Sequence, residues 1–280
     1  MSRNPYHRDN EPPTLRPSVL VFMDILGYSA FIKQAHERGN QSDALKAIHQ
    51  ALSSGRRWID AEEMRAQVSE PNKRDPYALK AFTDNIVIGW PIHDDAEHEL
   101  GNTIDMLSGF QMQLTLDGFF VRGAISIGEC YVDEVAVFGD ALLDAHYGES
   151  KTARDPRVIL TDTAVSAAKQ HLEYYPDRYH SPYTRLLLRD ADDQWFVNYL
   201  QCVLINEEEY GAYNQPLLQH KAVVEGMLAL HKKNPPIWSK FAWVAAYHNF
   251  FCESYPHQFG DKHKIDVELF RASPGLILET

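Results

Sequence analysis

The sequence predicts an α+β or α/β sandwich that continues into helices at its C-terminal end. Short apolar runs rich in β-branched residues recur between residues 18 and 204, as expected for buried strands. Segments in which apolar residues recur every three or four positions separate these runs and indicate helices. From about residue 207 only the helical spacing remains. Strands that alternate with helices are typical of layered folds built on a sheet.

We expect the first strand at residues 18–23, an apolar run that is too short for a helix. Helical spacing follows from about residue 29 and again over residues 42–64. Residues 77–83 and 86–90 form two apolar runs joined at Asp84 and Asn85, which favour turns, so a hairpin is predicted there. A helix with acidic residues in its first turn is expected over residues 94–116.

In the second half of the chain, strands are expected at residues 119–131, 135–138 and 158–160, with a helix near residues 141–149. A further strand pair is expected at residues 183–189 and 195–204. Two C-terminal helices are expected at residues 221–231 and 238–252, and the aromatic residues of the second should pack on a core or on a second subunit. These patterns predict a flexible leader over residues 1–16, one domain over residues 17–206 and a helical extension over residues 207–280.

Composition and charge exclude several function classes. The 280 residues carry 27 Lys and Arg against 39 Asp and Glu, a formal net charge of −12, and such a surface repels a phosphate backbone, so no nucleic-acid partner is expected. The three cysteines, Cys130, Cys202 and Cys252, have no CxxC spacing, which argues against a disulfide framework or a thiolate zinc site. Without an apolar signal core or a run of ~18 apolar residues, we expect a cytoplasmic protein with no membrane partner.

A carboxylate ends the first predicted strand, directly before a glycine and a helix start. In this arrangement Asp24 can hold a divalent cation, while the N–H groups of Ile25 to Ser29 face an anion at the positive end of the helix dipole. Together a cation and an amide cradle would suit a polyphosphate. The alternative, equally open at this point, is that Asp24 only caps the helix.

A second carboxylate, Asp84, stands at the tip of the predicted hairpin between two apolar strands. By itself it is more typical of a turn residue that hydrogen-bonds its own backbone. Two acids at neighbouring strand ends, however, are compatible with a two-metal site, in which the ions lie ~3.5–4 Å apart and take hard oxygen ligands. The pair Asp24 and Asp84 is therefore the candidate catalytic and metal centre.

Four motifs in this order resemble those of class III nucleotidyl cyclases. The segment Phe22-Met-Asp24-Ile25-Leu-Gly27-Tyr-Ser29 resembles the F-x-D-I-x-G-F-[ST] opening of the family, and Lys80-Ala-Phe-Thr-Asp84 resembles its K-x-x-G-D hairpin, with Thr83 in place of Gly. The run from Val121-Arg122-Gly123 to Gly128 is similar to its R-x-G-I-x-x-G strand, and Val137-Phe138-Gly139 to its V-W-G. The resemblance covers roughly residues 18–205. It implies an α+β fold with a mixed sheet and flanking helices, to which the C-terminal helices are added.

Within that superfamily, the short build and the tail at residues 240–249 look most like the bacterial Pycsar pyrimidine cyclases of antiphage defence. This resemblance implies a homodimer with active sites at the interface, and conversion of UTP or CTP to a 3′,5′-cyclic nucleotide and pyrophosphate. UTP is preferred to CTP, so the implied activity is that of a uridylate cyclase whose product, cyclic UMP, activates a separate effector protein. The alternatives are a cytidylate cyclase, an inactive nucleotide-sensing domain and, less favoured, a two-metal phosphohydrolase.

The resemblance also assigns roles to individual residues. Asp24, Asp84 and the Ile25 carbonyl would bind two divalent cations, Mn²⁺ or Mg²⁺. Lys80 would be supplied by the partner chain. The full set of nucleotide-binding positions that it implies is Phe22, Ile25, Leu26, Gly27, Tyr28, Ser29, Lys80 and Arg122.

Besides Thr83, and Glu129 at a place where some relatives have a phosphate-binding Arg, three positions depart from the cyclase pattern. The family's purine-reading Asp falls on Ala136, which argues against ATP because an unpaired polar edge is costly to bury. Its V-N-x-x-x-R motif, which stabilises the transition state, falls on Leu142-Leu143 and Tyr147, so both the Asn and the Arg are missing. Either another cation serves, with Arg122, Lys151 and Arg154 as candidates, or the domain is inactive.

Two histidine-containing segments are expected to be structural. Residues 93–99 contain two histidines among acids but lack the HExxH spacing, and are interpreted as an acidic helix start. His248 lies in the aromatic C-terminal helix and is interpreted as a packed, hydrogen-bonded histidine.

Overall fold

The computed structural model describes residues 4–7, 12–67, 75–205 and 214–271. The chain forms two compact units, Met1–Cys202 and Val203–Thr280. The first contains the sheet and the candidate site, and the second contains the C-terminal helices.

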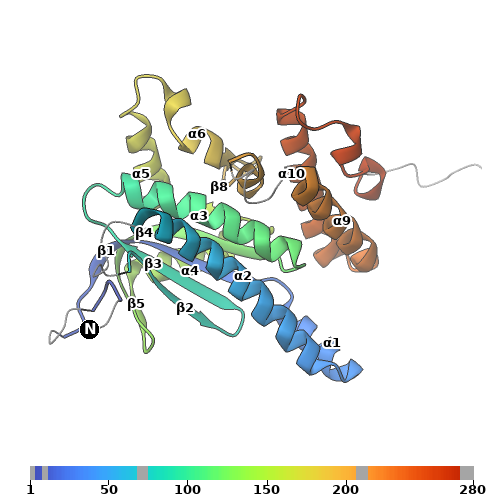
Figure 1. Cartoon of the computed structure of the whole chain (residues 1–280), viewed down its shortest axis with the longest axis horizontal. Helices are drawn as coiled ribbons and strands as arrows, with labels where there is room; N and C mark the ends of the chain where they lie inside the picture. Colours follow the sequence, from blue (N-terminus) through green and yellow to red (C-terminus); the bar gives the residue numbers. More distant parts are fainter. Residues whose placement is uncertain (1–3, 8–11, 68–74, 206–213, 272–280) are drawn as a thin grey trace, which may run out of the picture. The chain divides into compact units, whose positions relative to one another are not determined.

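The first unit is built on a mixed sheet (Figure 1). This sheet has eight strands in the order β2-β3-β1-β4-β6-β8-β7, and β5 pairs with β4. Among the described residues β4 and β6 run parallel and the other paired strands run antiparallel. The strands are β1 (Arg16–Ile25), β2 (Ala78–Phe82), β3 (Asn85–Pro91), β4 (Val121–Val132), β5 (Val137–Gly139), β6 (Val158–Leu160), β7 (Leu187–Arg189) and β8 (Trp195–Val197).

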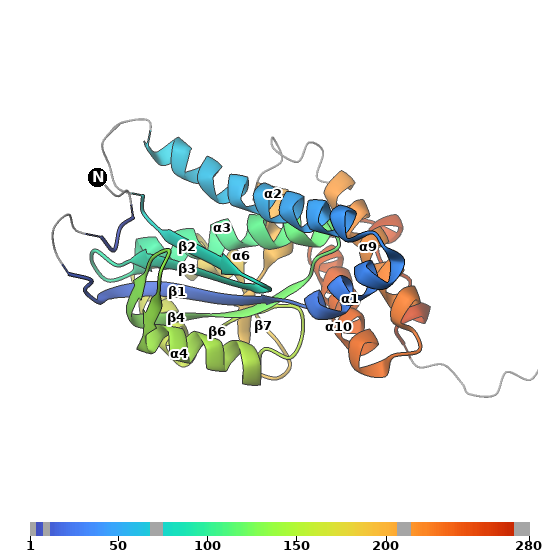
Figure 2. The ribbon, with the colours of Figure 1, turned by 90° about the horizontal axis from the view of Figure 1, so that it is seen from below.

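Helices cover both faces of this sheet. Helix α3 (Glu97–Leu116) lies on one face, with α2 (Gln41–Gln67) packed on it, and α4 (Asp140–Tyr147) lies on the other face against β1 and β4 (Figure 2). A central strand covered on both faces must be apolar throughout, and the side chains from Val19 to Met23 are indeed all buried. The remaining helices of this unit include α1 (Tyr28–Arg38), α5 (Asp162–Leu172) and α6 (Tyr183–Leu186), and α7 (Cys202–Ile205) follows at its end. The expected mixed sheet with flanking helices is confirmed.

Two expectations about individual elements were wrong, and one helix was missed. Helix α5 was not predicted, residues 183–186 form helix α6 instead of a strand, and the strand expected to reach residue 204 ends at Val197. A 3₁₀ turn, Tyr199–Gln201, and α7 take its place. Residues 183–186 and the residues after Val197 were assigned to strands for the same reason. Each belongs to a short run rich in apolar residues, and such a run has no periodicity by which a strand can be told from a helix.

The expected flexible leader is also wrong over residues 4–7, which pack on the sheet. Tyr6 is 2% exposed, and its hydroxyl donates to Ser18 Oγ at 2.8 Å and lies 3.3 Å from Cys130 Sγ. Gly89 makes room for it, because a Cβ at that position would lie 2.6 Å from the Tyr6 hydroxyl. The buried aromatic ring therefore holds a segment that its composition alone marks as loose.

The second unit pairs α9 (Asn214–His231) with α10 (Pro235–Ser254). Phe241 and Tyr247 of α10 are buried, as expected for a helix that packs on a core. The interpretation of His248 as a packed histidine is confirmed, since Nε2 donates to the His263 carbonyl at 2.8 Å and Nδ1 lies 2.9 Å from Nδ1 of His220. Burial lowers the pKa of His248 to about 4, which keeps this ring neutral. None of the described helices of the chain has the length and apolarity that a membrane span requires.

Candidate active site

Asp24 lies one residue before the end of β1, where three strands meet. It stands opposite Asn85 of β3 and opposite Arg122 of β4 in the strand register. The strand before it is buried, but the Asp24 side chain itself is 20% exposed. The end of the central strand thus presents a carboxylate at the edge of the core, as the sequence predicts.

Asp84 is held beside it by the hairpin between β2 and β3. The turn consists of Thr83 and Asp84, and the Ile25 N–H donates to the Asp84 carbonyl at 2.9 Å. The Asn85 side-chain amide donates to Asp84 Oδ1 at 3.1 Å, and the Thr83 hydroxyl lies 2.8 Å from the same oxygen. These contacts fix both the backbone and the carboxylate of Asp84 next to Asp24.

The two predicted acids interact directly. The pKa of Asp24 is raised to about 6: burial is the largest cause, the Glu149 and Asp84 carboxylates also raise it, and the Arg122 guanidinium lowers it. The Arg122 guanidinium lies near Asp24 and Glu149, and with Asp84 included the three carboxylates leave a surplus of two negative charges when all are ionised. A divalent cation would neutralise that surplus.

Glu149 is the member of this cluster that the sequence analysis missed. It lies on a π-helical turn, Gly148–Thr152, that continues α4, and it is 4% exposed. Its Oε1 lies 2.6 Å from Arg122 Nε, and the same nitrogen lies 3.7 Å from Asp24 Oδ2. No spacing signal marks Glu149, because the π turn departs from the helical period that precedes it.

Helix α1 starts at the site, but only part of the expected amide cradle is open. The Ile25 N–H donates to Asp84, and the Leu26 N–H donates to the Phe120 carbonyl at 2.8 Å, so the expectation that these two amides bind an anion is wrong. The N–H groups of Gly27, Tyr28 and Ser29 have no hydrogen-bond acceptor among the described residues. These three open amides lie at the positive end of the helix dipole.

The alternative in which Asp24 only caps α1 is wrong. The N-cap position is occupied by Gly27, and no side chain caps the helix. Gly27 has a φ of 78°, in the left-handed region that glycine adopts without strain. The carboxylate of Asp24 is therefore not committed to the helix.

Phe22 and Lys80, two further predicted residues, lie on β1 and β2. Phe22 is 6% exposed and packs edge-on against His146 at 5.1 Å between ring centroids, so its side chain is part of the core, and its expected role in nucleotide binding stays a prediction. Lys80 lies on β2 opposite Val87, and no ion pair joins it to an acid within the described residues. Lys151 and Arg154 are exposed and also form no ion pair with these acids in that part of the chain, whereas Arg122 does.

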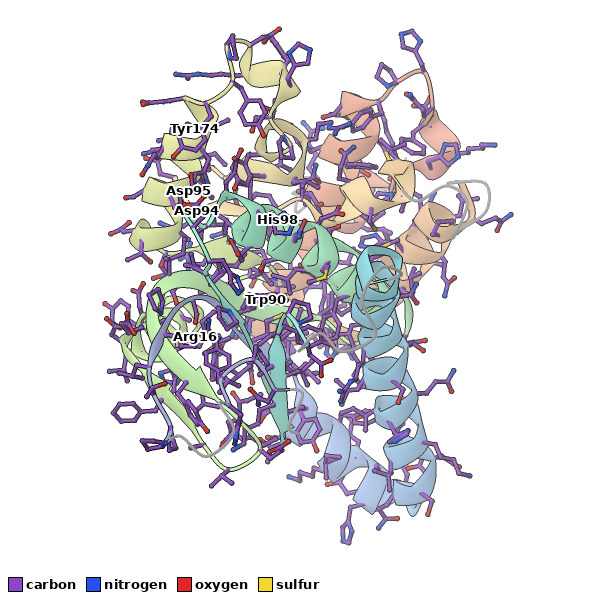
Figure 3. The ribbon with its side chains drawn as sticks, turned by 60° about the vertical axis from the view of Figure 1, so that its left-hand side comes forward. Arg16, Trp90, Asp94, Asp95, His98 and Tyr174 are labelled. Atoms are coloured by element: carbon purple, nitrogen blue, oxygen red, sulfur yellow. The ribbon has the colours of Figure 1, made fainter. Side chains whose placement is uncertain are left out.

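The acids at residues 93–99 serve the start of α3. The Glu97 N–H donates to Asp95 Oδ1 at 3.1 Å, and His93 Nδ1 lies 3.2 Å from Glu99 Oε1. Tyr174 contacts Asp95 from the segment after α5 (Figure 3). The structure thus confirms the interpretation of this segment as an acidic helix start.

A group of exposed apolar side chains lies on β5, on the turn before it and on α4. Leu143 and Tyr147, one helical turn apart, are 70% and 63% exposed and occupy the positions where the cyclase pattern has Asn and Arg. Val135 and Phe138 are 86% and 67% exposed. We call Val135, Phe138, Leu143 and Tyr147 the apolar patch.

The donors at the site fit a hard divalent cation. No group of three or more His, Cys, Asp or Glu that could hold a metal occurs in the described parts of the chain. Mg²⁺, however, is commonly held by one or two carboxylates together with substrate phosphates, and Asp24 and Asp84 supply such a pair.

No protein-family model matches the chain, and no curated protein matches it in sequence. Among solved structures it is similar to a class III adenylyl cyclase-like ATP-binding protein from Pseudomonas aeruginosa, with a TM-score of 0.40 and 14% identity over 63% of this chain and 42% of that one. It is also similar to the guanylyl cyclase Cya2, with a TM-score of 0.40 and 15% identity over 66% of this chain and 93% of that one. The chain thus spans less than half the length of the first of these proteins.

Proposed function

We propose that the protein is a metal-dependent nucleotidyl cyclase that converts UTP to 3′,5′-cyclic UMP and pyrophosphate. The observation that carries the proposal is the pairing of Asp24 with Asp84 at the start of α1, where the amides of Gly27, Tyr28 and Ser29 are open. A carboxylate pair next to open helix amides provides a place for cations and for a polyphosphate at once.

The carboxylates, the open amides and the guanidinium of the site each have a different role in this proposal. Asp24, Asp84 and the Ile25 carbonyl would hold one or two Mn²⁺ or Mg²⁺ ions. Ions held there would supply the positive charge that lowers the pKa of the ribose 3′-hydroxyl and stabilises the leaving pyrophosphate. The open amides of α1 bind the phosphates, and Arg122 supplies positive charge beside the acids. Catalysis by such a site consists mainly of positioning and electrostatic stabilisation.

The pyrimidine preference is supported by Ala136. Because Ala136 offers no polar group to the edge of a purine, ATP would leave that edge unpaired. The sequence resemblance to Pycsar cyclases supports a pyrimidine substrate and a role in antiphage defence, in which the cyclic product activates a separate effector. Of UTP and CTP we propose UTP, an order that rests on no single residue.

A homodimer with the site at its interface is part of the proposal. The apolar patch lies on α4, β5 and the turn before it, and large apolar side chains exposed on neighbouring elements are compatible with a surface that another chain covers. Lys80 would then contact the nucleotide bound by the partner chain, which is consistent with its lack of an ion pair to the acids of its own chain among the described residues.

The test is to incubate the purified protein with each of the four ribonucleoside triphosphates and Mn²⁺ and to identify products by mass spectrometry. We expect cyclic UMP from UTP, and none from Asp24→Asn or Asp84→Asn protein that remains folded. A cyclic purine would contradict the pyrimidine preference. Near-normal turnover by either variant at saturating Mn²⁺ would contradict the metal assignment.

A second candidate function is favoured by a specific observation. Leu143 and Tyr147 replace the Asn and Arg on which transition-state stabilisation depends in the resembling family. A domain that binds nucleoside triphosphates through Asp24 and Asp84 and serves as a sensor needs neither residue. Binding of UTP measured by calorimetry, with no product after prolonged incubation, would favour this sensor over the cyclase.

A further inference from the structure

The Arg122 guanidinium lies between the carboxylates of Glu149 and Asp24 but is closer to that of Glu149. Its Nε is 2.6 Å from Glu149 Oε1 and 3.7 Å from Asp24 Oδ2. Glu149 is almost completely buried, whereas the Asp24 side chain is 20% exposed. The buried acid therefore holds the closer ion pair, and the acid that faces the site is left with the weaker one.

This distribution matters because Arg122 and a cation compete for the same oxygens. A guanidinium paired closely with Asp24 would occupy the carboxylate and add positive charge where a divalent ion must bind. A guanidinium removed altogether would leave no positive charge for a phosphate. The ion pair with Glu149 keeps the Arg122 guanidinium near the site, where it can bind a phosphate. It also keeps the guanidinium far enough from Asp24 to leave that carboxylate available to a cation.

The backbone at Glu149 lies close enough to β4 for the Glu149 side chain to reach Arg122. The π turn Gly148–Thr152 packs against β4, and a Cβ on Gly148 would lie 2.7 Å from the Ala124 Cβ. Only glycine allows this close approach, which brings the next residue, Glu149, to the side chain of Arg122 on β4. Short π-helical segments of this kind are frequent at functional sites.

We propose that Glu149 is a positioning residue that keeps Arg122 away from Asp24, so that Asp24 stays available to a divalent cation and Arg122 to an anionic substrate group. This inference rests on the proposed function, in which Asp24 and Asp84 bind the ion. It differs from a direct ligand role for Glu149, because Glu149 acts through Arg122.

The test measures Mn²⁺ affinity without nucleotide, from the electron paramagnetic resonance signal of free Mn²⁺, so that no turnover is needed. Glu149→Gln should weaken Mn²⁺ binding by about 10-fold or more, the usual loss when a partner outside the ligand shell is removed, because Arg122 then pairs with Asp24. Glu149→Asp, which keeps the charge on a shorter side chain, should restore part of the affinity. Glu173→Gln, at an exposed acid after α5, is the charge-matched control and should bind like wild type.

The double variant separates this mechanism from a direct one. In an Arg122→Gln background the loss caused by Glu149→Gln should fall to about 2-fold or less, because no guanidinium remains to occupy Asp24. An equal loss in both backgrounds, or unchanged binding in Glu149→Gln protein whose thermal unfolding is normal, would overturn the inference. In the wild-type background the same substitution should raise the KM for UTP and lower kcat together.

The outcomes for the inference and for the proposed function are distinguishable. Mn²⁺ binding that depends on Asp24 and on Glu149 as predicted, in a protein that makes no cyclic product, would support the positioning role and refute the cyclase. Mn²⁺ binding that Asp24→Asn does not weaken would overturn both.

Discussion

Replacement of Asp24 by Asn should stabilise the metal-free protein at neutral pH while it removes the cation site. The folded-state pKa of Asp24 is about 6 against an ordinary value of 3.8, and burial is the largest cause. Because the folded pKa is the higher one, ionisation of Asp24 costs stability as the pH rises from about 4 through 6. The difference of 2.2 pKa units corresponds to at most about 3 kcal/mol at pH 7.5, and solvent screening of this partly exposed side chain reduces it to about 1–3 kcal/mol.

The prediction has a definite pH dependence. At pH 4 the folded protein holds the proton on Asp24 and the unfolded chain holds it about half of the time, so the gain from Asp24→Asn should fall below about 1 kcal/mol. The assay is urea unfolding of wild type and variant in the presence of EDTA at pH 4 and pH 7.5, followed by a probe of the first unit. The amide variant should be the more stable at pH 7.5. A loss of stability at pH 7.5, or an equal gain at both pH values, would refute the account of the buried acid cluster.

Three other predictions concern the core and the site. Tyr6→Ala should lower the free energy of unfolding by about 3–4 kcal/mol, because it removes a buried ring and its hydroxyl bond to Ser18, and chemical denaturation measures this; a change under about 0.5 kcal/mol would mean that residues 4–7 are not docked in solution. Gly148→Ala should lower the free energy of unfolding by about 1–3 kcal/mol, because the added methyl group would collide with Ala124, and it should also weaken Mn²⁺ binding. A variant with wild-type stability would show that the π turn can accommodate a Cβ at this position. A mixture of Asp24→Ala and Lys80→Ala proteins should recover part of the cyclase activity that each lacks, since one site of a mixed dimer is intact; an inert mixture with proven subunit exchange argues against a shared site.

The carboxylate pair could be predicted from the sequence because it depends on local patterns. A strand that ends in Asp24 and a hairpin with Asp84 at its tip need only pair in register to bring the two acids together, and β1 does pair with β3 so that Asp24 faces Asn85. The start of α1 after Gly27 follows from the same local reasoning. Most strands and helices of the sheet domain were predictable for this reason.

What the sequence does not reveal depends on contacts between distant segments. Glu149 contacts Arg122 because it lies on a π turn, which no periodicity in the sequence predicts. The Leu26 N–H donates to the carbonyl of Phe120, almost a hundred residues away in the chain. Tyr6 belongs to a polar, proline-bearing segment, so its burial follows only from the space that Gly89 leaves on β3. None of these contacts can be predicted from the sequence, because no sequence pattern links the residues that form them.

In the proposed function, the site cleaves a nucleoside triphosphate between its α- and β-phosphates by attack of the 3′-hydroxyl. The most direct measurement is a ³¹P nuclear magnetic resonance time course of UTP with the protein and Mg²⁺, recorded beside Asp84→Asn protein. We expect cyclic UMP and pyrophosphate in equal amounts from the wild type and neither from the variant. Orthophosphate as the released product, or the same spectrum from both proteins, would contradict the proposed function.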